Sequence, residues 1–241
     1  MQSPVTPYKS PESKKQQVAG MFDNIAGSYD FLNHFLSIGI DKLWRRKLVR
    51  LIGMENPQTI LDVATGTADL AIAESKLKPK KITGIDISEK MLEIGKEKIR
   101  KLNISGLVEL QTGDSESIQF PDNSFDAVSV AFGVRNYENL QTGLSEMRRV
   151  LKPGGKLFIL EFSKPHNPLI KKLYYFYFCN VLPFIGKLVS KDARAYAYLP
   201  ESVEQFPDGK QFAELLQRTD FKNIQCIPLT FGISTIYIAQ K

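Results

Sequence analysis

Three carboxylates and a single glycine occupy positions in the sequence that suit the binding of a nucleoside. Asp62 and Asp86 each end an apolar run, and Asp114 follows a third run. Gly66 lies in the small-residue turn after Asp62, and Asp86 follows it by 20 residues, the interval at which a second-strand acid reaches the ribose of a bound adenosine. An ordinary strand-to-helix turn also favours glycine, so the turn alone leaves both interpretations open. The three carboxylates together favour a binding site.

Adenosine without a pyrophosphate fits this turn best, because a dinucleotide fingerprint has three glycines where the turn has one. S-adenosylmethionine meets that description, and carboxylates such as Asp62 would attract its sulfonium and ammonium groups. An enzyme that uses it must mainly align a nucleophile with the activated methyl group and exclude water. We therefore predict S-adenosylmethionine as co-substrate. No metal is predicted, because two histidines and two cysteines form no zinc site; Cys179 and Cys226 are expected to be reduced packing residues.

The elements that must position these residues alternate regularly along the chain. This alternation predicts an α/β fold: a doubly wound, mostly parallel, seven-stranded Rossmann-like sheet with right-handed crossovers. Asp69 is expected to cap the helix that follows the first strand. The expected strands cover residues 59–62, 81–87, 107–111, 125–131, 156–162, 224–227 and 233–239, and the expected helices cover 41–51, 88–102, 138–151 and 210–218.

The N-terminal region divides into a polar tail and an aromatic helical arm. Residues 1–20 are rich in Ser, Pro, Lys and Gln and lack the apolar core of a signal peptide, which predicts a flexible tail on a cytoplasmic protein, with the domain covering 21–241. Residues 18–52 have a helical pattern whose aromatic side chains either line a pocket or pack as core. The formal charge of +6 is spread over separated basic groups typical of solvated helix faces, so no nucleic acid partner is predicted.

An aromatic-rich insertion follows the fifth strand and covers about residues 163–208. Its apolar run is interrupted by Pro183 and Gly186 and is shorter than the roughly 20 apolar residues that span a bilayer. Three interpretations are comparable: the insertion covers an apolar ligand, lies in a membrane interface, or is buried against the domain.

The chain resembles the class I methyltransferases, and more closely the family that C-methylates the ring of demethylmenaquinol or of ubiquinone precursors. The resemblance covers nearly everything after Gly20. Its two signatures appear as Tyr29-Asp-Phe-Leu-Asn-His-Phe-Leu-Ser37, continuing to Trp44, and as Arg149-Val-Leu-Lys-Pro-Gly-Gly-Lys-Leu-Phe-Ile-Leu-Glu-Phe-Ser163. The segment Phe132-Gly-Val-Arg-Asn136 is also similar to the family.

The resemblance implies which residues hold the co-substrate. Thr67 would hold its amino-acid end, Asp86 its ribose, and the pair Asp114-Ser115 the edge of its adenine. The family usually has glycine where Ala68 stands, a difference of little consequence if the backbone is right-handed there.

Two further positions depart from the family's pattern. The family has histidine where Asp41 stands, so a candidate base is missing, and it has serine where Ala131 stands, so a hydroxyl contact to the co-substrate is missing.

The implied reaction is methyl transfer to a ring carbon of a lipid-soluble quinol. Arg135 is predicted to stabilise the phenolate or to position a water that takes the proton, and Asn136 and Tyr29 to orient the ring. The competing interpretation of Arg135 is a salt bridge at the end of a strand. Other small-molecule methylation, RNA methylation and RNA binding are the alternative functions, and peripheral contact with the inner face of the cell membrane is an additional expectation.

Overall fold

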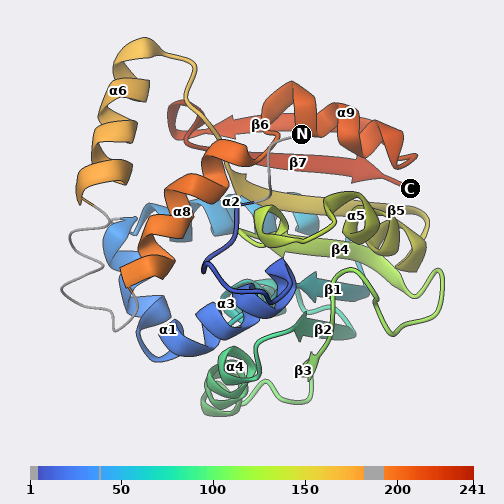
Figure 1. Ribbon diagram of the computed structural model, residues 1–241. Helices are drawn as coiled ribbons and strands as arrows, with labels where there is room; N and C mark the ends of the chain where they lie inside the picture. The colour runs from blue at the N-terminus through green and yellow to red at the C-terminus, as the bar shows by residue number, and fades with distance from the viewer. Residues whose placement is uncertain (1–4, 38, 182–192) are drawn as a thin grey trace.

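The strands that carry the predicted carboxylates lie side by side in one sheet of the computed structural model, which describes residues 5–37, 39–181 and 193–241 (Figure 1). The strand order is β3-β2-β1-β4-β5-β7-β6; the first five strands in the chain run parallel, and β7 runs antiparallel to both β5 and β6. The doubly wound prediction is therefore confirmed. The strands are β1 (Thr59–Val63), β2 (Lys81–Asp86), β3 (Val108–Thr112), β4 (Phe125–Ala131), β5 (Leu151–Phe162), β6 (Lys222–Leu229) and β7 (Ser234–Gln240).

The strand order reverses at β1, which lies between β2 and β4. Ligands of open α/β sheets bind in the crevice beyond the carboxyl ends of the strands at such a point. The register places Asp62 beside Gly84 of β2 and Ser129 of β4. A Cβ on Gly84 would lie 2.9 Å from the Thr65 hydroxyl oxygen, so glycine lets the turn after β1 fold closely over β2.

Amphipathic helices cover both faces of the sheet. Leu48 of α2 and Leu92 of α4 are buried on one face, and Leu144 of α5 and Phe212 of α9 are buried on the other. Ser88 caps α4 as predicted by accepting a hydrogen bond from the Met91 amide at 3.3 Å, a contact typically contributing about 1 kcal/mol. The bounds are α2 (Ile40–Gly53), α3 (Asp69–Glu74), η1 (Ser75–Leu77), α4 (Glu89–Lys101), η2 (Val134–Asn136), α5 (Leu140–Val150), α9 (Gly209–Arg218) and η4 (Thr230–Gly232).

Three further helices gather at the end of the sheet to which the arrowheads of β1 and β2 point: α1 (Lys14–Leu36), α6 (Pro168–Phe176) and α8 (Ala193–Gln205) (Figure 1). The π-helical segment η3 (Tyr177–Val181) follows α6. Residues 182–192 of the predicted insertion, with Pro183 and Gly186, lie outside the described residues. None of the helices in the described ranges is long and apolar enough to cross a membrane.

The predicted tail is wrong for residues 14–20, because α1 begins at Lys14. Val18 is buried there, and Gln17 is only 2% exposed. The Gln17 side chain accepts a hydrogen bond from the Tyr8 amide at 2.9 Å and donates to the Glu12 carbonyl at 2.8 Å. These contacts fold the preceding residues back onto the first turns of α1.

Two local predictions also need correction. β5 starts at Leu151 rather than Lys156, because Pro153–Gly155 form a bulge within the strand: Phe125 pairs with Leu151, and Ala127 already pairs with Lys156. Cys226 lies exposed on β6 instead of packing in the core.

Candidate active site

The turn after β1 is held in a strained conformation. Ala64, Gly66 and Ala68 have positive φ angles of 54°, 57° and 65°. Left-handed backbone costs a residue with a Cβ about 1–2 kcal/mol, and such strain gathers at functional sites. The expectation that Ala68 matters little with a right-handed backbone is therefore wrong, because the backbone is left-handed at the position where the resembled family has glycine.

Asp86 joins this turn to the start of α4. Its carboxylate accepts hydrogen bonds from the Gly66 amide at 2.8 Å and from the Ser88 amide at 2.9 Å. Burial raises the pKa of Asp86, and the two amide donors oppose that rise. A Cβ on Gly66 would meet no atom within 4 Å, so the glycine leaves open space beside this carboxylate.

The two carboxylate oxygens of Asp62 differ in their hydrogen bonding to the turn. Its Oδ2 accepts hydrogen bonds from the Thr65 hydroxyl at 2.6 Å and the Ala71 amide at 3.2 Å. Its Oδ1 is buried and has no hydrogen-bond partner among the described residues. Burial raises the pKa of Asp62 to about 7. A buried acid oxygen of this kind suits a cationic ligand group.

Thr67 connects the turn to α1. Its hydroxyl donates a hydrogen bond to Asp30 at 2.5 Å, and Lys98 Nζ lies 2.6 Å from the other oxygen of that carboxylate. Lys98 Nζ also lies 2.7 Å from Asp69. Asp69 therefore does not act as the predicted cap: the cap position is Ala68, and the Asp69 carboxylate serves an ion pair instead.

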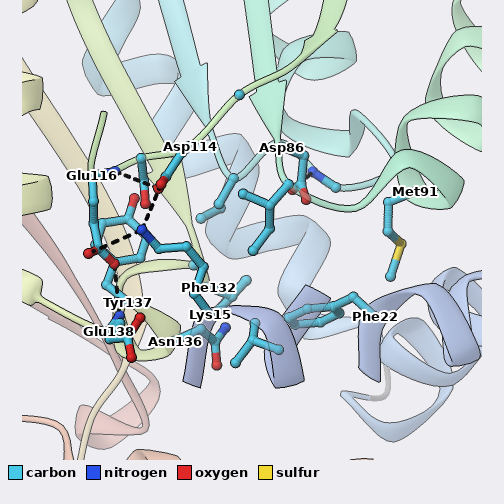
Figure 2. Close-up of a pocket in the computed structure, with 18 of the residues that line it drawn as sticks. Lys15, Phe22, Asp86, Met91, Asp114, Glu116, Phe132, Asn136, Tyr137 and Glu138 are labelled. Carbon is cyan, nitrogen blue, oxygen red and sulfur yellow. Dashed lines mark hydrogen bonds and ion pairs between the residues drawn. The ribbon is translucent and has the colours of Figure 1, made fainter. Parts of the chain in front are cut away.

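Asp114 and Ser115 lie at the far end of the same crevice, and Figure 2 shows Lys15 reaching from α1 toward Asp114 and Glu116. The Lys15 Nζ lies 2.6 Å from Asp114 Oδ2 and 3.4 Å from Glu116 Oε2. Gly66, Asp86, Asp114 and Ser115 line one pocket here, which we call the cofactor-side pocket.

A second, larger cavity of about 790 Å³ adjoins the cofactor-side pocket. Tyr29, Gly66 and Asn136 line both. Asp62, Thr67 and Arg135 line the larger cavity only, so the structure distributes the predicted site residues over two connected spaces. The volume lies within the range of ordinary small-molecule sites, roughly 300–1,000 Å³.

Arg135 forms the salt bridge that was one of the two interpretations offered for it, and it also lines the large cavity. Its guanidinium pairs with Glu161 at 2.8 Å, with side-chain exposures of 9% and 0%, so the salt bridge at the strand end exists. The same guanidinium lies over the Phe162 ring, 5.4 Å from its centroid, and lines the large cavity. Its buried Nε has no partner among the described residues.

Asp41 also lines the large cavity, where the resembled family has histidine. It accepts a hydrogen bond from the Ser37 hydroxyl at 2.6 Å and pairs with Arg45 at 2.9 Å. Its carboxylate is thus engaged by Arg45 of α2 and by Ser37, which precedes that helix.

Several residues of the site were missed by sequence reasoning. Asp30 and Glu161 stand inside the two signatures, where their neighbours Tyr29 and Phe162 could have drawn attention to them. Lys15 and Lys98 belong to polar helix stretches and carry no local signal.

The family to which this geometry belongs is settled by comparison with known proteins. The model of the ubiE/COQ5 methyltransferase family matches residues 10–241. The chain belongs to this family. It is an S-adenosylmethionine-dependent methyltransferase, as predicted.

Relatives of this methyltransferase match it over almost their whole length. "Demethylmenaquinone methyltransferase" of Bacteroides fragilis is 47% identical over 241 residues, covering 100% of this chain and 98% of the relative. The protein of the same name from Porphyromonas gingivalis is 44% identical, with 100% of both chains covered. "Ubiquinone/menaquinone biosynthesis C-methyltransferase UbiE" of Geotalea daltonii is 48% identical, covering 95% of this chain and 97% of the relative.

Solved structures share the fold of this methyltransferase. A SAM-dependent methyltransferase from Thermotoga maritima, described as a possible histamine N-methyltransferase, aligns with a TM-score of 0.63 at 17% identity, covering 92% of this chain and 99% of that chain. A putative S-adenosyl-L-methionine-dependent methyltransferase from Methanococcus maripaludis aligns with a TM-score of 0.60 at 21% identity, covering 97% and 96%. The Rossmann-like fold is thus confirmed.

Proposed function

We propose that this methyltransferase transfers the methyl group of S-adenosylmethionine to a ring carbon of demethylmenaquinol, giving menaquinol. The observation that carries the proposal is the large cavity, whose wall is built by Trp44, Phe132 and Phe162. The Phe132 and Phe162 ring centroids are 4.7 Å apart, and Trp44 lies 6.2 Å from each. Such a wall suits a flat aromatic acceptor, and the relatives' names point to a quinone precursor.

The co-substrate is assigned to the crevice above β1. The unpartnered oxygen of Asp62 suits the cationic methionine end of the co-substrate, and Thr67 would hold the same end. Asp86, beside the open space at Gly66, suits its ribose. Asp114 and Ser115 would hold the adenine edge. When bound, S-adenosylmethionine supplies a methyl group on a cationic sulfur, which leaves as a neutral thioether.

The acceptor's ring is assigned to the space shared by the two pockets. Loss of a phenolic proton raises the electron density of the ring, the ring carbon forms its bond to the methyl carbon, and loss of the ring proton restores aromaticity. The positive charge of Arg135 would stabilise the phenolate or position a water that takes the proton. Asn136 and Tyr29, which line both pockets, would orient the ring.

A methyl-transfer assay with reduced and oxidised acceptors tests this function. The purified protein should methylate demethylmenaquinol under reducing conditions and leave the oxidised quinone unchanged, because the quinone ring is poor in electrons. The name of the Geotalea daltonii relative suggests a second candidate acceptor, a demethylated ubiquinol precursor. Assaying it in parallel shows which of the two acceptors the protein methylates faster. Equal turnover of the quinol and the quinone would contradict the mechanism.

Peripheral contact with the cytoplasmic face of the cell membrane is part of the proposal. Leu43, Leu173 and Phe231 line the large cavity and are 57%, 58% and 76% exposed, so its mouth has an apolar rim. Lys171 and Lys172 are exposed on the same helix as Leu173. Apolar side chains with neighbouring cations suit an interface with anionic lipids.

Co-sedimentation with anionic vesicles tests this contact. The double variant Leu173→Ser with Phe231→Ser should lose vesicle binding. Leu102→Ser is a matched control, because Leu102 is a comparably exposed leucine (53%) at the end of α4. Equal vesicle binding of the double variant and the control would contradict membrane contact through this rim.

A further inference from the structure

Tyr198 of α8 lines the large cavity and carries a buried hydroxyl whose hydrogen-bonding capacity is not satisfied within the described part of the chain. The residue is 2% exposed and lines the large cavity. Its hydroxyl oxygen has no hydrogen-bond partner among the described residues. A buried polar group left unpaired typically costs about 1–3 kcal/mol, so native proteins keep few of them.

Besides Asp62 Oδ1, residues that line the same cavity carry two more buried polar atoms of this kind, Arg135 Nε and Asn136 Oδ1. They come from η2, more than 60 residues earlier in the chain, and α8 packs against η2. The charges of Arg135 and Glu161 both act on the Tyr198 hydroxyl. Arg135, Asn136 and Tyr198 therefore bring buried polar groups from two contacting elements to one cavity whose lining is largely aromatic and apolar.

We infer that the Tyr198 hydroxyl donates a hydrogen bond to a ring oxygen of the acceptor quinol and is a further catalytic residue of this site. The inference rests on the proposed function. Arg135 and Tyr198 are both donors, and a quinol presents two ring oxygens, one of which becomes more negative as the ring reacts. Burial raises the pKa of Tyr198 to about 12, so the hydroxyl keeps its proton near neutral pH and acts as a donor.

Tyr198→Phe removes the hydroxyl and keeps the ring. With demethylmenaquinol, kcat/KM should fall about tenfold or more, the effect of one buried hydrogen bond to a charge-bearing oxygen. The melting temperature of the free protein should not fall, because the hydroxyl has no hydrogen-bond partner within the described ranges, and S-adenosylmethionine affinity should stay unchanged. A purely structural role would instead lower the melting temperature.

Tyr237→Phe is the matched control. Tyr237 is 1% exposed, and its hydroxyl accepts a hydrogen bond from the Gly209 amide at 2.7 Å, away from the cavity lining. This variant should melt at a lower temperature and retain the wild-type kcat/KM in its folded form. The two tyrosines thus separate loss of stability from loss of acceptor binding.

Two acceptor analogues, each lacking one of the two ring hydroxyls, identify the contacted oxygen. Tyr198→Phe should be impaired on the analogue that keeps that oxygen and equal to wild type on the other. Turnover by Tyr198→Phe within about twofold of wild type on the full quinol would overturn the inference. Absence of turnover by the wild-type protein would refute the proposed function instead, so the two failures are distinguishable.

Discussion

Glu74→Gln should change how the stability of this methyltransferase depends on pH. Glu74 ends α3, is 0% exposed, and neither of its carboxylate oxygens has a hydrogen-bond partner among the described residues. Burial raises the pKa of Glu74 well above 4.5, and repulsion from Asp62 adds to the rise. Asp62 has two donors, from Thr65 and Ala71, so we expect Glu74 to lose its proton at a higher pH than Asp62.

The magnitude follows from proton linkage. Between pH 4.5 and the folded-state pKa of Glu74, the folded protein holds one proton that the unfolded chain has lost. The free energy of unfolding therefore decreases as pH rises, by about 1.4 kcal/mol per pH unit for one such proton. The stabilisation that this proton gives to the folded protein is complete below pH 4.5 and is lost as pH rises through the folded-state pKa of Glu74. The amide introduced by Glu74→Gln does not titrate, so the variant lacks this contribution to the slope.

Urea unfolding at pH 5, 6 and 7 measures the difference. The wild-type free energy of unfolding should decrease with rising pH relative to that of Glu74→Gln, with a slope that approaches about 1.4 kcal/mol per pH unit between pH 4.5 and the folded-state pKa of Glu74. Glu93→Gln, at an exposed position of α4, should run parallel to wild type. Parallel curves for Glu74→Gln and wild type would refute the assignment of the proton to Glu74.

Three further outcomes are expected from the same geometry. Asp86→Ala should lower S-adenosylmethionine affinity about 100-fold or more by calorimetry, since hydrogen bonds to a charged group contribute about 1.5–3 kcal/mol each and a ribose offers two hydroxyls. Asp126→Asn, at the amino end of β4 beside the start of β1, should leave this affinity unchanged. Lys98→Met should lower the free energy of unfolding by about 1 kcal/mol or more, because its ion pairs are partly buried, whereas Lys101→Met, from an exposed pair, should have little effect. Gly66→Ala should lower the free energy of unfolding by about 1–2 kcal/mol, because the φ angle of Gly66 is +57°, and should also weaken binding of the co-substrate. Unchanged urea midpoints for the lysine and glycine variants would count against these two expectations.

The predicted carboxylates could be located from the sequence because two simple rules place them. Apolar runs mark buried strands, and parallel strands bring their carboxyl ends to one edge. Asp62 is the penultimate residue of β1 and Asp86 is the last residue of β2, so their proximity follows from the order of the strands. The Gly66 amide indeed donates to Asp86 at 2.8 Å.

The remainder of the site depends on long-range contacts that no local pattern encodes. Thr67 meets Asp30 across 37 residues, and Arg135 meets Glu161 across 26. The start of α1 was mistaken for a tail because its composition is polar, although lysine and glutamine are good helix formers. Burial of Gln17 is a tertiary effect that composition does not predict.

Residues that line the large cavity carry buried donors and buried acceptors that have no hydrogen-bond partner among the described residues, and this mixture would suit two dissimilar ligands. The acceptors are Asp62 Oδ1, which suits a cation, and Asn136 Oδ1; the donors are Arg135 Nε and the Tyr198 hydroxyl, which suit a phenolate. Each unpaired atom raises the free energy of the empty protein, so pairing it contributes to binding. As the methyl group moves, the ring oxygen is most negative just before bond formation. Donors already fixed by Glu161 and by burial can then stabilise it without reorganising, the condition under which electrostatic catalysis is most effective.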